Sequence, residues 1–142
     1  MTIAIASDHG ALELKEAIIS HLKQKNIPVT NLGTNNTDSV DYPDYADKVA
    51  EAILSGEATL GILCCGTGIG ISIRANRHKG IRAALVFNKF TAEMAKAHNN
   101  ANILCLGGRT TPADVATELI DTWLNTKFEG GRHQRRLDKL DN

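Results

Sequence analysis

Short apolar runs alternate with amphipathic segments along almost the whole chain. The runs are bounded by polar or glycine residues and predict buried strands at 2–7, 27–32, 60–65, 81–87 and 102–106. Between the runs, apolar residues recur at helical spacing, as Leu14, Ile18 and Leu22 do. This spacing predicts helices at 11–25, 43–54, 71–78, 88–98 and 111–123, with Phe90, Met94 and Ala97 on the core side of the fourth helix.

Strands that alternate with helices favour a parallel sheet, because the crossover between two parallel strands usually runs through a helix. We therefore predict an α/β protein: a three-layer α/β/α, Rossmann-like sandwich with a five-stranded parallel sheet. The chain has 142 residues and shows no linker or repeat, so one domain with a C-terminal helical tail at 127–142 is expected. Ligands of such folds lie at the carboxyl ends of the strands, so residues that follow strands are the candidates for chemistry.

The most informative of these strand ends is the glycine-rich turn Cys64-Cys65-Gly66-Thr67-Gly68-Ile69-Gly70. A turn of this kind points several N–H groups into one concavity, which suits a phosphate or a developing oxyanion. A cysteine at its lip lies where a thiolate would be stabilised. Successive strand residues face opposite sides, and Cys65 is the nearer to the turn, so Cys65 is favoured for the site and Cys64 for the core. The same residues also fit a tight turn beside a structural cysteine.

Other polar residues follow the remaining strands. Asp8-His9, Asn88 and Gly107-Gly108-Arg109 are expected at the same sheet edge as the turn, although Asp8 also suits a helix N-cap. His98 ends a predicted helix, where a ligand could reach it. The glycine turn matches neither the dinucleotide fingerprint, which would follow the first strand, nor a Walker A loop, which needs a lysine.

The charges exclude some function classes. Sixteen Lys and Arg balance sixteen Asp and Glu, which disfavours a general nucleic-acid or membrane-surface binder, and the apolar runs are too short to span a bilayer. The start of the chain is expected to be a strand rather than a signal peptide. Three cysteines without a CxxC motif disfavour a disulfide framework or a zinc site and suit a reducing cytoplasm.

The tail breaks at Gly130-Gly131 and then becomes basic. Arg132 and Arg136 are four residues apart and therefore share one face of a helix, as a phosphate clamp requires. The alternatives are a solvated surface or a helix that packs on a partner subunit.

Taken together, a thiol, an anion-binding turn, imidazoles, a carboxylate and arginines suffice for proton abstraction next to the carbonyl of a sugar phosphate, and no metal-ligand set is apparent. Two other classes stay open. A non-catalytic phosphate- or nucleotide-binding module would need neither Cys65 nor His98. A thiol redox protein based on Cys64 and Cys65 is disfavoured, because adjacent cysteines form a strained disulfide.

Several motifs extend from the first strand to the tail: Ser7-Asp8-His9-Gly10, Asp41-Tyr42-Pro43, Cys65-Gly66-Thr67-Gly68-Ile69-Gly70-Ile71-Ser72, Ala75-Asn76, Gly80-Ile81-Arg82-Ala83, His98-Asn99-Asn100-Ala101-Asn102 and Gly130-Gly131-Arg132-His133-Gln134. In these motifs the chain resembles the type-B ribose-5-phosphate isomerases, within the family that also holds the galactose-6-phosphate isomerase subunits. One branch of that family has a glutamate six positions after the cysteine. Ile71 stands there, so the chain resembles the cysteine branch.

The resemblance implies interconversion of an aldose phosphate and a ketose phosphate without metal or cofactor, most simply ribose 5-phosphate and ribulose 5-phosphate. It makes Cys65 the base between C1 and C2, with Thr67 moving protons among the oxygens. Asp8 and His98 would assist ring opening. The remaining implied roles are substrate contacts: the enediolate at Gly66, Gly68 and Gly70, the sugar at Tyr42, Ser72 and Asn99, and the phosphate at His9, Arg109, Arg132 and Arg136.

The resemblance also implies a homodimer or tetramer with its site at the subunit interface, to which the tail and His98 come from the neighbour. An isomerase of a six-carbon phosphate, such as allose 6-phosphate or galactose 6-phosphate, is the alternative within the same class.

Overall fold

Five parallel strands form the middle layer of the molecule, in the spatial order β2-β1-β3-β5-β4. The computed structural model describes residues 1–141. Its strands are β1 Ile3–Ser7, β2 Val29–Asn31, β3 Leu60–Cys65, β4 Ala83–Leu85 and β5 Ile103–Gly107. The central strands β1 and β5 are buried along their whole length, as expected of parallel strands that are covered on both faces. The predicted parallel sheet is confirmed.

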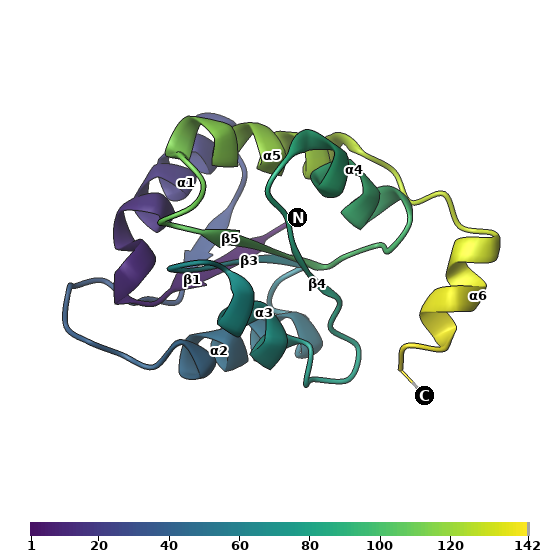
Figure 1. Cartoon of the computed structure of the whole chain (residues 1–142), viewed down its shortest axis with the longest axis horizontal. Helices are drawn as coiled ribbons and strands as arrows, with labels where there is room; N and C mark the ends of the chain where they lie inside the picture. Colours follow the sequence, from purple (N-terminus) through teal and green to yellow (C-terminus); the bar gives the residue numbers. More distant parts are fainter. Residues whose placement is uncertain (142) are drawn as a thin grey trace.

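Helices cover both faces of the sheet (Figure 1). One face carries α1 Leu12–Gln24, α4 Lys89–Ala97 and α5 Ala113–Asn125, and the other carries α2 Tyr42–Leu54 and α3 Ile69–Ala75. Each face has its own apolar core. Ile18 and Trp123 belong to the first core, and Val49 and Ile71 belong to the second. The predicted three-layer sandwich is therefore confirmed.

The strand register sets the ends of the three central strands level. Ser7 lies opposite Cys64, and Cys65 lies opposite Gly107. The chain leaving each strand is tied to its neighbour as well, because the Gly108 N–H donates to the Cys65 carbonyl at 2.8 Å. The segments after β1, β3 and β5 consequently start at one edge of the sheet, as the sequence predicted.

Two details of the elements differ from the prediction. β4 is only three residues long, and a short 3-10 turn, η1 at His9–Ala11, precedes α1. The prediction that Phe90 faces the core is wrong, because its side chain is 67% exposed. The buried line of α4 consists of the small residues Ala92, Ala95 and Ala97, which let the helix pack closely on its neighbours.

The basic tail ends in a short helix, α6 Arg132–Asp138, that lies beside the C-terminal end of α4 (Figure 1). The Glu129 N–H donates to the Ala97 carbonyl at 3.0 Å, and His133 and Leu137 are buried. The inner side of the tail thus packs on its own chain, while Arg132 and Arg136 are exposed. Packing of the tail against a partner subunit stays a prediction.

Candidate active site

Cys65 is the last residue of β3, and its thiol accepts a backbone hydrogen bond. The Gly68 N–H donates to Cys65 Sγ at 3.1 Å across the glycine turn. Gly68 has a left-handed φ of +80°, and a Cβ there would lie 2.7 Å from Leu85 Cδ1, so no other residue fits. A glycine that the fold requires therefore aims a backbone N–H donor at the sulfur.

The three cysteines occupy different environments, and all are free. Cys64 belongs to the core beneath α1 and α5, whereas Cys65 belongs to the core on the α2 and α3 side. The two therefore face opposite sides of the sheet, as predicted. Burial raises the pKa of Cys64, and it also raises the pKa of Cys105 well above its usual range. These two thiols are fully buried and stay protonated. Cys65 is the cysteine whose sulfur contacts the turn, through the Gly68 N–H.

Asp8 and His9 follow β1 at the same edge. The Asp8 carboxylate accepts from the Gly10 N–H at 2.9 Å and caps η1, so the helix-cap interpretation is right, while the residue also lies beside the turn. His9 is exposed, and its Nδ1 lies 3.1 Å from the Val40 N–H, which donates to it. A neutral His9 ring therefore carries its hydrogen on Nε2, which leaves that N–H available to an anion.

A buried lysine anchors the loop that carries Val40. Lys15 is fully buried, and its ammonium donates to Asn31 Oδ1 at 2.9 Å and Asn35 Oδ1 at 2.8 Å. Desolvation lowers the pKa of Lys15, and the neighbouring Glu16 opposes that shift. Lys15 lies in the helix predicted at 11–25, and no local pattern in the sequence reveals this anchoring role.

The side chains of Arg109 and Tyr42 also lie at this edge, where each packs closely against glycines. The guanidinium of Arg109 lies 3.3 Å from the position of a Cβ at Gly66 and 3.5 Å from one at Gly10. Two ring carbons and the hydroxyl oxygen of Tyr42 lie only 2.6–2.8 Å from the position of a Cβ at Gly70. The glycines therefore leave space for both side chains, which places an arginine and a tyrosine over the turn.

Thr67 and Ser72 differ in their availability to a ligand. Thr67 is exposed, and its Oγ1 accepts from the Ile69 N–H at 3.2 Å. Ser72 is buried, and its hydroxyl donates to the Ile69 carbonyl at 2.7 Å within α3. The hydroxyl of Ser72 is thus engaged inside the helix rather than offered at the surface.

The other predicted residues form a second group around the tail. His98, Asn99, Arg132 and Arg136 line a cavity of about 300 Å³ together with His133 and two leucines. In Figure 1 this group, marked by α6, lies on the far side of the molecule from the carboxyl ends of β1 and β3. One chain thus brings together Asp8, His9, Tyr42, the 65–70 turn and Arg109, but it does not bring His98, Asn99 or the tail arginines to them.

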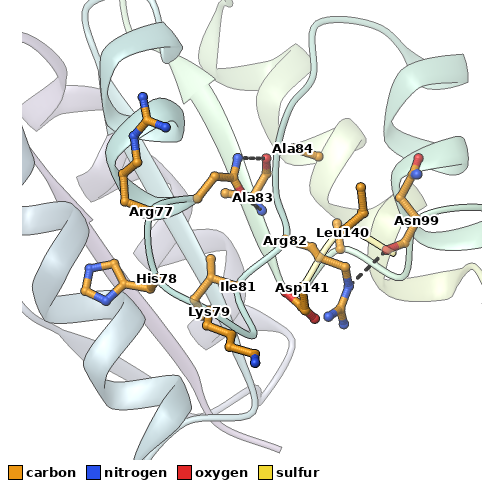
Figure 2. A pocket seen from close by; sticks show the side chains of 12 residues that line it. Arg77, His78, Lys79, Ile81, Arg82, Ala83, Ala84, Asn99, Leu140 and Asp141 are labelled. Atoms are coloured by element: carbon orange, nitrogen blue, oxygen red, sulfur yellow. Dashed lines mark hydrogen bonds between the residues drawn. The ribbon is translucent and has the colours of Figure 1, made fainter. Parts of the chain in front are cut away.

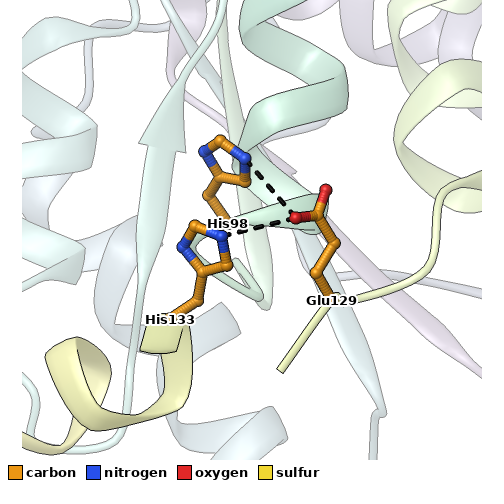
Figure 3. Close-up of side chains that lie close together, drawn as sticks. All are labelled: His98, Glu129 and His133. Atoms are coloured by element: carbon orange, nitrogen blue, oxygen red, sulfur yellow. Dashed lines mark ion pairs between the residues drawn. The ribbon is translucent and has the colours of Figure 1, made fainter. Parts of the chain in front are cut away.

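Two histidines and a glutamate meet within the second group (Figure 3). The rings of His98 and His133 are stacked, with centroids 4.1 Å apart and planes 14° apart. Glu129 Oε1 lies 3.4 Å from His133 Nε2 and 3.8 Å from His98 Nε2. Burial, followed by the charges of His98 and Arg132, lowers the pKa of His133. Sequence spacing links Glu129 to His133, but only folding brings His98 to them.

A cavity of about 630 Å³ lies beneath the end of the tail (Figure 2). Basic side chains line it, but those of His78 and Arg82 already have partners. His78 Nε2 lies 2.7 Å from Asp47 Oδ1, and Arg82 Nε donates to the Asn99 and Asn100 carbonyls at 3.1 Å each. These contacts hold the segment after α3 to α2, and they hold the segment before β4 to the end of α4. None of the helices in residues 1–141 is long and apolar enough to cross a membrane.

Fold and site together define an α/β protein whose sheet edge presents a hydrogen-bonded thiol among groups that bind anions. A family model described as Ribose/Galactose Isomerase matches residues 3–140. The sequence is 55% identical to a putative sugar phosphate isomerase of Rickettsia conorii over 138 residues, which are 97% of this chain and 96% of that protein. The chain belongs to the ribose/galactose isomerase family and is a sugar phosphate isomerase.

Solved structures agree with this assignment. The ribose-5-phosphate isomerase B of Clostridium thermocellum has a TM-score of 0.98 at 50% identity, over 99% of this chain and 95% of that one. The ribose-5-phosphate isomerase B of Mycoplasma genitalium, solved with bound ribulose-5-phosphate, has a TM-score of 0.93 at 48% identity, over 98% and 93% of the two chains.

Proposed function

We propose that this chain interconverts ribose 5-phosphate and ribulose 5-phosphate through an enediolate, with Cys65 as the base. The observation that carries the proposal is the hydrogen bond from the Gly68 N–H to Cys65 Sγ, beside Asp8, Tyr42 and Arg109. The bond aims a backbone donor at the sulfur atom that accepts the proton when Cys65 acts as the base. Among the relatives, the structure with bound ribulose-5-phosphate supports a five-carbon substrate.

The proposed isomerisation proceeds by proton transfers alone and needs no oxidant or reductant. The Cys65 thiolate removes the proton on C2 of the open aldose, and the electron pair of that bond forms the C1–C2 double bond. The charge moves to the C1 oxygen, where N–H groups of the 66–70 turn stabilise it. Cys65 then returns the proton to C1, while Thr67 passes the O2 proton to O1, which leaves the ketose carbonyl at C2.

The other residues bind and open the sugar. Asp8 and His98 assist ring opening, in which the C1 hydroxyl loses a proton, the bond from C1 to the ring oxygen breaks and that oxygen gains a proton. Tyr42 and Asn99 contact the hydroxyls of the sugar. His9, Arg109 and the tail arginines bind the phosphate, because charge-assisted bonds to phosphate are stronger than neutral ones. Holding the phosphate fixes C1 and C2 over the thiol, which lowers the entropic part of the barrier.

We propose further that two copies of the chain complete each site. The two groups of residues lie apart in one chain, so a neighbour has to supply His98, Asn99, Arg132 and Arg136 to the turn of its partner (Figure 1). Large apolar side chains are exposed on α3, on α4 and after β4. Ile73 of α3 is 52% exposed, Phe87 after β4 is 65% exposed and Phe90 of α4 is 67% exposed. Exposed apolar side chains on neighbouring elements favour burial by a second copy.

A substrate panel tests the proposed reaction. Ribose 5-phosphate, allose 6-phosphate and galactose 6-phosphate are each incubated with the protein in excess chelator, and the ketose is measured by chromatography. We expect turnover of ribose 5-phosphate at the highest kcat/KM, unchanged by the chelator. Preference for a six-carbon phosphate would overturn the assigned substrate, and loss of turnover in chelator would overturn the metal-free mechanism.

A further inference from the structure

The cluster of His98, Glu129 and His133 has the donor set of a metal site (Figure 3). One ligand atom from each residue lies within 4.8 Å of the other two. Two imidazoles and one carboxylate suit Zn²⁺, which binds such sets in sites that keep a fourth position open. Nothing in the proposed isomerisation uses Glu129, so its place beside the two stacked rings needs an explanation of its own.

His133 supplies a second, independent observation. Its side chain is only 8% exposed, and within residues 1–141 its Nε2 has no hydrogen-bond partner. This nitrogen points toward Glu129 Oε1 at 3.4 Å, a separation outside good hydrogen-bond geometry. Buried polar atoms are rarely left without a partner, so an unpaired nitrogen aimed into a donor cluster indicates a missing ligand.

The spacing of the donors fits one small cation. Bonds of about 2.05 Å in a tetrahedral site place neighbouring ligand atoms about 3.3 Å apart. Glu129 Oε1 lies 3.4 Å from His133 Nε2 and 3.8 Å from His98 Nε2, and the three ligand atoms all lie within 4.8 Å of one another. Because the two rings are stacked with planes 14° apart, one ring has to turn out of this arrangement before both nitrogens point at one ion. The two ring nitrogens that face Glu129 lie on the same side of the stacked rings (Figure 3).

The backbone holds all three residues in place before any ion binds. The His98 N–H donates to the Met94 carbonyl at 3.0 Å, and the Glu129 N–H donates to the Ala97 carbonyl at 3.0 Å. His133 is fixed by its bond to the Gly130 carbonyl at 3.1 Å. The main chain is therefore ordered before binding, whereas the Glu129 side chain, which is 53% exposed, is ordered only when the ion binds, at a cost in affinity. Arg132 and Arg136 line the same cavity, so a cation binds more weakly here than in a four-ligand structural site.

We propose that His98, Glu129 and His133 bind one Zn²⁺ ion per chain. The ion inhibits the isomerase, because coordination occupies the ring nitrogen of His98. The inhibition, unlike the metal site, rests on the role of His98 in the proposed function. An enzyme that needs no metal would thus carry a site through which zinc lowers its rate.

The test measures binding apart from activity. Cys65→Ser provides the background, because it removes the thiolate as a competing ligand. Metal-free protein is titrated with Zn²⁺ against a chromophoric chelator, and Glu129→Gln and His133→Asn are compared with Glu118→Gln, an exposed glutamate of α5. We expect one Zn²⁺ per chain, a Kd raised about tenfold or more by either cluster variant, and no change in the control.

Absence of stoichiometric binding, or a Kd that neither cluster variant changes, would overturn the site. Folding of each variant is checked by urea denaturation, and Co²⁺ absorption gives a second readout, because cobalt bound by nitrogen and oxygen lacks a thiolate charge-transfer band. With Cys65 intact, Zn²⁺ inhibition that Glu129→Gln relieves supports the coupling. Zinc that binds the cluster without slowing turnover supports the site and overturns the role of His98 instead.

Discussion

Replacing Gly70 by alanine separates the stability of the fold from the geometry of the site. Gly70 lies in α3, and the Cβ of Ala would meet ring and hydroxyl atoms of Tyr42 at 2.6–2.8 Å. Ordinary contact begins at 3.4 Å, so the ring has to retreat by 0.6–0.8 Å. Tyr42 is 39% exposed and begins α2, so it can rotate into solvent with little resistance.

Two opposing effects set the stability of this variant. Alanine favours a helix over glycine by about 1 kcal/mol. Overpacking costs about 1–3 kcal/mol, and the exposed ring places this case at the lower end. The free energy of unfolding should therefore change by no more than about 1 kcal/mol. Displacement of a substrate-positioning group by about 1 Å can lower a rate by about 10²-fold, so kcat/KM should fall about 10- to 100-fold.

The assay pairs urea denaturation with steady-state kinetics on ribose 5-phosphate. Tyr42→Ala, alone and combined with Gly70→Ala, provides the matched control. If the ring transmits the effect, Gly70→Ala has no further consequence for kcat/KM once Tyr42 is alanine. A folded Gly70→Ala protein with the wild-type kcat/KM would refute the placement of Tyr42 in the site.

Three further predictions concern the phosphate, the thiols and acid stability. Arg132→Ala combined with Arg136→Ala should raise KM about 10²-fold with less effect on kcat, because each lost charge-assisted bond costs about 1.5–3 kcal/mol. An unchanged KM in steady-state kinetics would contradict the phosphate-binding role of these arginines. Alkylation of native protein, mapped by peptide mass spectrometry, should modify Cys65 about tenfold or more faster than Cys64, and equal rates would contradict the difference in burial. Hydrogen bonds from Arg74 and His78 lower the pKa of Asp47. These partners therefore add roughly 0.5–1 kcal/mol to the free energy of unfolding at pH values above about 3.9, the pKa of Asp in the unfolded state. This stabilisation is lost as the pH falls through the lower pKa of the folded state. Urea midpoints of wild type and Asp47→Asn should therefore converge below about pH 4, and a constant difference would contradict the shift.

The sequence predicted the parts of the molecule that depend on local patterns. Continuous apolar runs identified the five strands, because buried parallel strands need apolar residues on both faces. Alternation along β3 correctly assigned Cys64 to one core and Cys65 to the other. Phe90 was misassigned because helical spacing alone does not reveal that alanines form the buried line of α4. The helix propensity and the hydrophobic pattern of a segment do not show which of its apolar side chains pack against the rest of the fold.

The site was harder to predict because its contacts join distant segments. Nothing near Gly70 in the sequence indicates that it meets Tyr42, and nothing near Lys15 indicates its bonds to Asn31 and Asn35. The cluster of Glu129 with two histidines was missed for the same reason. Motif resemblance gave the candidate residues and implied that the tail and His98 come from a neighbour, and the fold places the two groups apart in one chain.

That separation makes subunit mixing the most direct test of a site shared between two chains. Cys65→Ala and the charge-reversed variant Arg132→Glu with Arg136→Glu are purified, each nearly inactive at substrate below the wild-type KM. They are then mixed under conditions in which subunits exchange. Random pairing gives heterodimers with one intact site each, so the mixture should recover about a quarter of wild-type activity. No recovery, with exchange confirmed by native mass spectrometry, would contradict the shared site.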